Sequence, residues 1–133
     1  MDNKLLEELI HLGHLEKEYD KLGKKIKMRT LTTGELTECD AAAAGKDILT
    51  YSRQIKVECL ARSILSISGI PFESMTILDK VKLLNNCSGP VVDSMYECYL
   101  DLTDAQNKIL SDQDLGENIK NLQGTPEAEP SSK

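Results

Sequence analysis

A strand-like segment and a helix start follow one another in Lys24-Lys25-Ile26-Lys27-Met28-Arg29-Thr30-Leu31-Thr32-Thr33-Gly34-Glu35. Between residues 25 and 31, apolar and charged side chains alternate, as the two faces of a half-buried β-strand require. Thr32 and Glu35 then stand three residues apart, which is the spacing of a capping box at a helix N-terminus. A lone strand is unstable, so this one needs a partner strand, which another subunit could supply.

Helices are expected on both sides of this segment. Leucines recur every three or four residues between residues 3 and 22, which predicts an amphipathic helix that ends at Gly23. Further helices are expected after Thr32 through residues 41–44, and over residues 47–68, 77–85 and 90–112, with a weak extension over 115–122. The predicted fold is therefore mainly α: a small domain of about four to five helices with one short strand near residues 25–31.

The chain has 133 residues, which suits one folded domain. We expect residues 1–23 to form an N-terminal amphipathic helix that can act as a docking arm. Residues 24–122 then form the helical core domain. Residues 123–133 contain no apolar anchor and are expected to be a disordered acidic tail.

Composition and charge exclude several classes of protein. Apolar residues make up 40% of the chain, too many for a wholly disordered protein, and the net charge is −6. No apolar run approaches the roughly 18 residues of a membrane span, and acids interrupt the N-terminal apolar segment, so we expect neither a membrane anchor nor a secretory signal. The acidic C-terminal third argues against nucleic-acid binding. A small regulatory or DNA-binding module that uses the basic run 24–29 remains an alternative.

The sequence offers little to build an active site. Glu8, His11 and His14 have ligand-like spacing on the first predicted helix, but a di-iron site needs two such motifs, and only one is present. Cys39, Cys59, Cys87 and Cys98 form no Cys-x-x-Cys pair and are expected to be free, buried thiols. We find no phosphate-binding glycine loop or nucleophile motif. The prediction is a protein without enzymatic activity, cofactor or metal.

The apolar stripes of the first and last long helices are the candidate binding surfaces. In the last helix the stripe can equally be the core of the domain, but tyrosines beside a methionine are also typical of protein interfaces. The candidate partner-binding residues are Leu5, Leu9, Leu12, Val92, Met95, Tyr96, Tyr99 and Leu102.

Three segments resemble small tail-morphogenesis proteins of tailed bacteriophages. The first contains the leucine–threonine–x–x–glutamate helix start in Ile26-Lys27-Met28-Arg29-Thr30-Leu31-Thr32-Thr33-Gly34-Glu35-Leu36. The second is a helix with an Ile-x-Gly turn, Cys59-Leu60-Ala61-Arg62-Ser63-Ile64-Leu65-Ser66-Ile67-Ser68-Gly69-Ile70-Pro71. The third is Ser88-Gly89-Pro90-Val91-Val92-Asp93-Ser94-Met95-Tyr96-Glu97-Cys98-Tyr99-Leu100-Asp101-Leu102. The resemblance covers about residues 25–122 and leaves the first helix outside.

The resemblance implies one of two roles, both carried out by protein–protein binding. A tail assembly chaperone binds the tape-measure protein, keeps its apolar helices soluble in the host cytoplasm, and leaves before the tail is complete. A small baseplate or hub protein instead remains in the virion. The family implies no catalytic residue and no cofactor; the expected partners are tape-measure or baseplate proteins, with a second copy of the chain as a further candidate.

Overall fold

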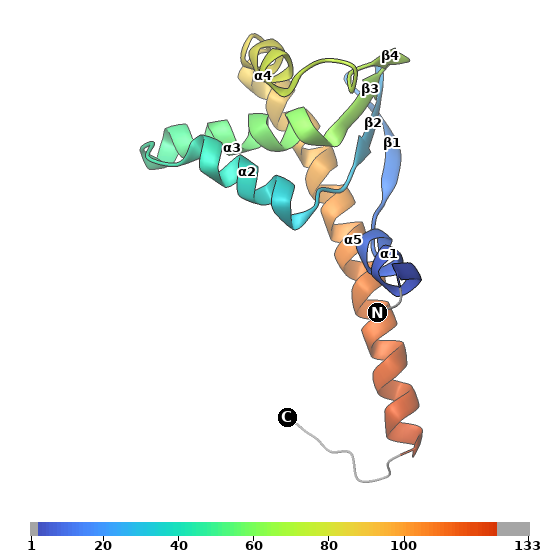
Figure 1. The fold of residues 1–133 in the computed structure, drawn as a ribbon. Coiled ribbons are helices and arrows are strands. Elements are labelled where there is room, and N and C mark those ends of the chain that lie inside the picture. Colours follow the sequence, from blue (N-terminus) through green and yellow to red (C-terminus); the bar gives the residue numbers. More distant parts are fainter. Residues whose placement is uncertain (1–2, 125–133) are drawn as a thin grey trace.

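The computed structural model describes the backbone of residues 3–124 and the side chains of residues 3–112. The elements follow in the order α1 (Asn3–His11), β1 (Glu16–Lys21), β2 (Lys24–Arg29), α2 (Thr33–Ala43), α3 (Ile48–Ser63), β3 (Ile64–Ile67), β4 (Ile70–Pro71), α4 (Ile77–Asn85) and α5 (Gly89–Gly124). Figure 1 shows α2 and α3 on one side of α5 and the sheet on the other.

The predicted fold class is wrong, because the chain is α+β. The strands form a four-stranded antiparallel sheet in the order β1-β2-β3-β4. The expected strand is present as β2, but both of its partners come from this chain. β1 pairs along one edge of β2, from Glu16↔Arg29 to Lys21↔Lys24, and β3 pairs along the other.

The predicted helix over residues 3–22 is wrong beyond α1. Residues 16–21 form β1, and Gly23 belongs to a hairpin turn instead of a helix end. Leu22 and Gly23 both have positive φ, 58° and 72°, as the two central residues of a type I′ turn require. The leucine spacing continues past α1 because Leu15, just before β1, and Tyr19 on β1 both pack against the core. Strand pairing here overrides the helical periodicity.

The predicted helix over residues 47–68 also ends early. α3 stops at Ser63, and residues 64–67 continue directly as β3, whose Ile64 and Ile67 pair with Met28 and Ile26. Isoleucine suits this strand because its branched side chain packs well on a pleated surface. The end of the apolar run that begins in α3 therefore forms β3, which pairs with the free edge of β2.

Other predicted elements are confirmed. Thr32 caps α2 with a complete capping box, Thr76 caps α4 over the expected residues, and a long helix covers residues 90–112. The weak helix predicted over residues 115–122 is part of α5. Of the predicted acidic tail, residues 123 and 124 lie in α5, and residues 125–133 lie outside the described residues.

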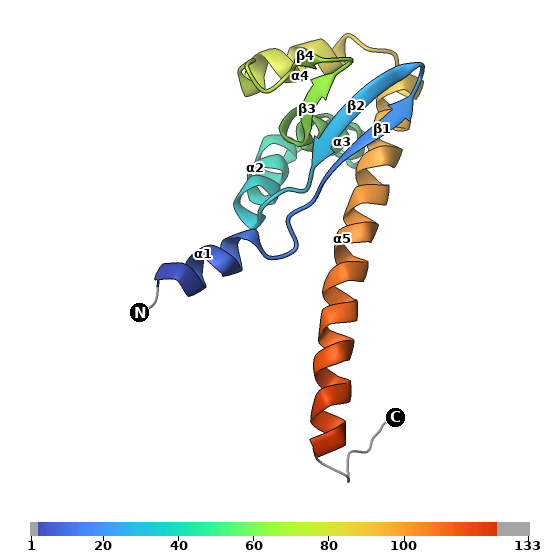
Figure 2. The ribbon, with the colours of Figure 1, turned by 90° about the vertical axis from the view of Figure 1, so that its right-hand side faces the viewer.

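The core lies where the sheet meets α3 and α5. Ile26 and Met28 on β2, Leu60 on α3, Ile64 at the start of β3, and Leu102 on α5 are fully buried there. α3 is the central helix, since it contacts α2, α4 and α5. α5 crosses behind the β1–β2 hairpin and runs on past the sheet (Figure 2).

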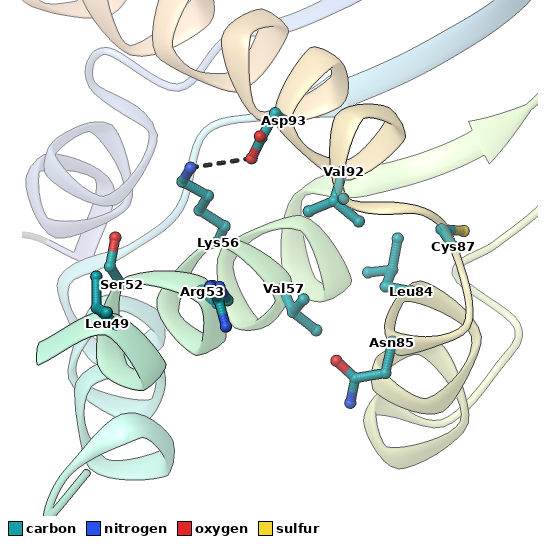
Figure 3. Close-up of a pocket in the computed structure, with 11 residues that line it drawn as sticks. Leu49, Ser52, Arg53, Lys56, Val57, Leu84, Asn85, Cys87, Val92 and Asp93 are labelled. Atoms are coloured by element: carbon teal, nitrogen blue, oxygen red, sulfur yellow. Dashed lines mark hydrogen bonds and ion pairs between the residues drawn. The ribbon is translucent and has the colours of Figure 1, made fainter. Parts of the chain in front are cut away.

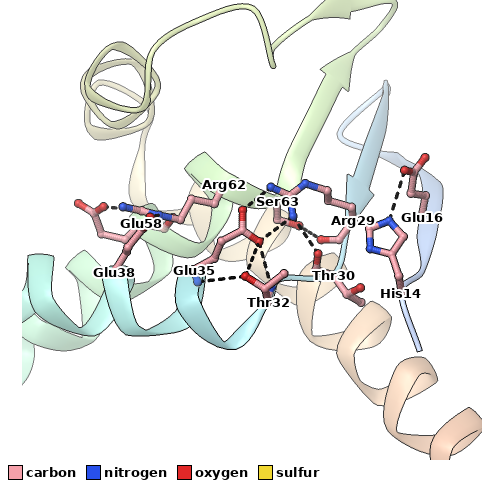
Figure 4. Close-up of polar contacts among 10 residues, drawn as sticks. All are labelled: His14, Glu16, Arg29, Thr30, Thr32, Glu35, Glu38, Glu58, Arg62 and Ser63. Atoms are coloured by element: carbon pink, nitrogen blue, oxygen red, sulfur yellow. Dashed lines mark hydrogen bonds and ion pairs between the residues drawn. The ribbon is translucent and has the colours of Figure 1, made fainter. Parts of the chain in front are cut away.

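A charged joint fixes β2 to α2 (Figure 4). The Arg29 guanidinium donates two hydrogen bonds to the Glu35 carboxylate, one of them at 2.8 Å. Glu35 Oε1 also accepts a hydrogen bond from the Thr32 backbone N–H at 3.0 Å. Ser63 Oγ donates to the Arg29 carbonyl at 2.6 Å, which attaches α3 to the same corner.

The hairpin turn predicts a stabilising substitution. Leu22 is half exposed and has a left-handed backbone, which costs an ordinary residue about 1–2 kcal/mol. Asparagine tolerates this conformation and precedes glycine in the preferred type I′ turn. We expect Leu22→Asn to raise the free energy of unfolding by about 0.5–1 kcal/mol in urea titrations. Leu22→Val should lower it, and equal stability of all three proteins would contradict the turn geometry.

The joint predicts a defined acid dependence of stability. Hydrogen bonds from Arg29 lower the pKa of Glu35 from 4.5 to about 2. Because the pKa is lower in the folded state, the contribution is complete above pH 4.5 and is lost as the pH falls towards 2. Glu35→Gln can keep the capping box but removes the titrating carboxylate. We expect it to reduce the change in the free energy of unfolding between pH 4.5 and 2, measured by urea titration at each pH, by at most about 3 kcal/mol.

The matched control is Glu18→Gln, which changes an exposed carboxylate on β1. It should leave the slope of stability against pH between 4.5 and 2 unchanged. An equal loss of slope in both variants would show that general charge, and not the joint, controls acid unfolding.

Candidate protein-binding surfaces

α1 and Leu12, which follows it, carry an apolar surface that the described part of the chain leaves uncovered. No residue of this nine-residue helix is buried. The exposed fractions of Leu5, Leu9 and Leu12 are 61%, 66% and 53%. We call this set the α1 apolar surface; its members are Leu5, Leu6, Leu9, Ile10 and Leu12. Such a patch is typical of an interaction site.

The C-terminal end of α1 is anchored while its body is not. The Gly13 carbonyl accepts a hydrogen bond from Gln106 Nε2 at 3.0 Å. Gly13 has a φ of 78°, and a Cβ there would lie 3.2 Å from the Leu110 side chain. In Figure 2, α1 extends from this point away from α5. The helix is therefore held at one end and presented outward.

The apolar stripe predicted on α5 lies mostly in the core, whereas the α1 apolar surface is exposed. Val92, Met95, Tyr99 and Leu102 are all buried in the core. Tyr96 is half buried, with its ring stacked on that of Tyr99 at 5.6 Å and Lys56 Nζ 5.7 Å from its ring centre. In this conformation the stripe is core. The eight candidate residues therefore separate into three exposed residues, two on α1 and Leu12 just after it, and five on α5 that pack inward.

A groove between three helices was not predicted (Figure 3). Its cavity volume is about 350 Å³. The α3–α4–α5 groove is lined by Leu49, Ser52, Arg53, Lys56, Val57, Leu84, Asn85, Cys87, Gly89, Val92 and Asp93. Lys56 Nζ donates to Asp93 Oδ1 at 3.0 Å across one side. The lining comes from three helices, so no single sequence motif marks it, although Ile48-Leu49 at the start of α3 is an exposed apolar pair.

The histidines and thiols form no catalytic or metal-binding arrangement among the described residues, although His11 is part of α1 and Cys87 lines the α3–α4–α5 groove. His14 Nε2 is 3.5 Å from Glu16 Oε2, and within residues 3–112 no three metal-ligating side chains gather. All four cysteines are free; Cys87 is half buried and the other three are buried. The hydrogen bond with Cys39, together with burial, raises the pKa of the Cys59 thiol. Cys59 is therefore protonated at neutral pH and is a poor nucleophile.

Comparisons with known proteins give no relative. No protein-family model, curated protein or solved structure matches the chain. Within the part that the structure describes, no helix is long and apolar enough to cross a membrane. The α1 apolar surface and the α3–α4–α5 groove are the features that bear most directly on function.

Two aspartate substitutions, one on α5 and one on α1, test which of the candidate residues belong to the core. Met95 is 4% exposed, so Met95→Asp places a charge in the core and should lower the free energy of unfolding by at least about 3 kcal/mol. Leu9→Asp should change it by no more than about 0.5 kcal/mol, because Leu9 lies outside the core. Chemical denaturation followed by circular dichroism measures both. Unfolding by Leu9→Asp, or tolerance of Met95→Asp, would contradict this assignment.

Proposed function

We propose that this chain is a bacteriophage tail-morphogenesis protein, a tail assembly chaperone that binds the tape-measure protein in the host cytoplasm. The exposed α1 apolar surface carries the proposal. The resemblance of residues 26–36, 59–71 and 88–102 to that family supports the assignment to tails. The function is binding, without a catalytic step.

The energetics of α1 favour a docking role. A nine-residue helix is too short to be stable alone in water, and no residue of α1 is buried in its own domain. Complete burial of one leucine side chain contributes roughly 1.5–3 kcal/mol. Three leucines at spacings of four and three would therefore supply several kcal/mol on a partner helix, in the helix-in-groove mode. Part of that gain offsets the entropy lost on association.

The basic run favours a protein partner over a nucleic acid. Lys25 Nζ lies 3.0 Å from Asp20 Oδ1, and Lys27 Nζ lies 3.6 Å from Glu16 Oε1. Arg29 is bound to Glu35. Three cations of the run are thus already paired with carboxylates, which weakens the phosphate attraction that DNA binding depends on.

Co-expression with the tape-measure protein of the same phage tests the proposal. We expect the intact chain to retain that protein on affinity capture. The double variant Leu5→Asp/Leu9→Asp should reduce its recovery at least about tenfold, because a loss of 1.4 kcal/mol already gives that factor. Leu78→Asp is the matched control, since Leu78 is 63% exposed on α4 and lies outside both surfaces.

Failure of the intact chain to retain the tape-measure protein would contradict the proposal, as would equal recovery with the double variant. Mass spectrometry of mature particles distinguishes the two tail roles. A chaperone should be abundant in the infected-cell lysate and absent from the particle. A stoichiometric amount in the particle would instead identify a baseplate or hub component.

A further inference from the structure

Two complementary features lie on different parts of each chain. One is the exposed apolar surface of α1, and the other is the α3–α4–α5 groove. We propose that α1 of one copy docks in the α3–α4–α5 groove of a second copy, so that copies assemble head to tail. The inference rests on the proposed binding role of α1 and names a second copy of the chain as its partner.

The groove has the chemistry to accept apolar side chains. Val57, Leu84 and Val92, which are buried, form its apolar floor, and Leu49 at the edge, with 66% of its surface exposed, is the apolar side chain that an occupant can cover. A volume of about 350 Å³ is at the lower end of the roughly 300–1,000 Å³ range of ligand pockets. It suits a few leucine-sized side chains projecting from a helix.

Charge favours α1 as the occupant. Arg53 is exposed at the groove and forms no hydrogen bond or ion pair with the residues that the structure describes, whereas Lys56 is bound to Asp93. On α1, Glu8 lies three residues after Leu5 and four before Leu12, so it borders the apolar face. A docked α1 can therefore place its leucines over the groove and its carboxylate near the Arg53 guanidinium.

The docked helix must come from another copy. Gly13, just after α1, is held at Gln106 and Leu110 of α5, whereas the groove meets α5 at Val92 and Asp93. At 1.5 Å per residue, Asp93 and Gln106 are about 20 Å apart along the helix. α1 itself spans only about 13 Å by the same rise, and Figure 2 shows it directed away from α5. Its own groove is out of reach while Gly13 stays in place.

Docking of α1 in the groove of another copy gives a head-to-tail assembly. The donor surface and the acceptor surface are different on each copy, so the interface is heterologous. Such interfaces produce rings when the rotation between copies closes and open filaments when it does not. Each internal copy then has both α1 and its groove covered, so a second copy and the tape-measure protein compete for the same α1 surface.

The test is the solution mass of the purified full-length chain, measured by light scattering across a concentration series. The intact chain should exceed the monomer mass of 14.8 kDa at high concentration. Leu9→Asp disables the donor and Leu49→Asp disables the acceptor, and each variant alone should be a monomer. Asp at position 49 lies in the first turn of α3, where an acid suits the helix dipole.

Mixing the two variants gives the decisive result. The Leu49→Asp protein keeps an intact α1 and the Leu9→Asp protein keeps an intact groove. Their mixture should therefore give a discrete dimer of twice the monomer mass and no larger species. The charge swap Glu8→Arg with Arg53→Glu should restore assembly that either change alone weakens, and Leu78→Asp should assemble like the intact chain.

Three outcomes would overturn the inference. They are a monomeric intact chain at every concentration, an oligomer that Leu49→Asp leaves unchanged, as pairing of α1 with α1 would give, and a variant mixture that stays monomeric. The result is independent of the tape-measure experiment. Assembly without tape-measure capture would overturn only the proposed function, and capture through α1 by a monomeric chain would overturn only this inference.

Discussion

Burial of Ile26 and Met28 on β2 is the constraint on which the rest of the structure depends. Both side chains are almost completely enclosed, and they can be so only if β2 has a strand on each side and helices over one face. β1 and β3 supply the strands, α5 contacts β2, and Leu60 of α3 belongs to the same buried cluster. The Arg29–Glu35 joint then sets where α2 begins, directly after the strand ends. The alternating side chains of six residues thus organise elements from both ends of the chain.

Local sequence patterns are sufficient to predict those parts of the structure that interactions between neighbouring residues determine. The capping box at Thr32, the cap at Thr76 and the alternation in β2 are predicted correctly because neighbouring residues determine them. The fold class was misjudged because two strands carry helix-like spacing. Leu15 and Tyr19 continue the leucine pattern of α1, and Ile64 and Ile67 continue that of α3. Their conformation is decided by pairing with β2, a contact that periodicity within one segment does not encode.

The candidate binding residues were also predicted only in part from local sequence patterns. Leu5, Leu9 and Leu12 were predicted as a binding surface from amphipathicity, and they are exposed in the fold. The stripe on α5 has the same spacing, yet it is covered by the sheet and α3. Spacing identifies an apolar helix face, but only the tertiary arrangement decides whether the protein itself covers that face. The groove could not be predicted at all, since α3, α4 and α5 each supply part of its lining.

The central claim is that α1 is a docking element outside the cooperative core. Amide hydrogen exchange measured on the dilute chain and on its assembled or partner-bound form tests this most directly. We expect fast exchange throughout residues 3–11 in the dilute chain and strong protection of residues 24–29 in both samples. Residues 3–11 should become protected only on assembly or partner binding. Protection of α1 in the dilute chain equal to that of β2 would contradict the claim, because α1 would then belong to the core.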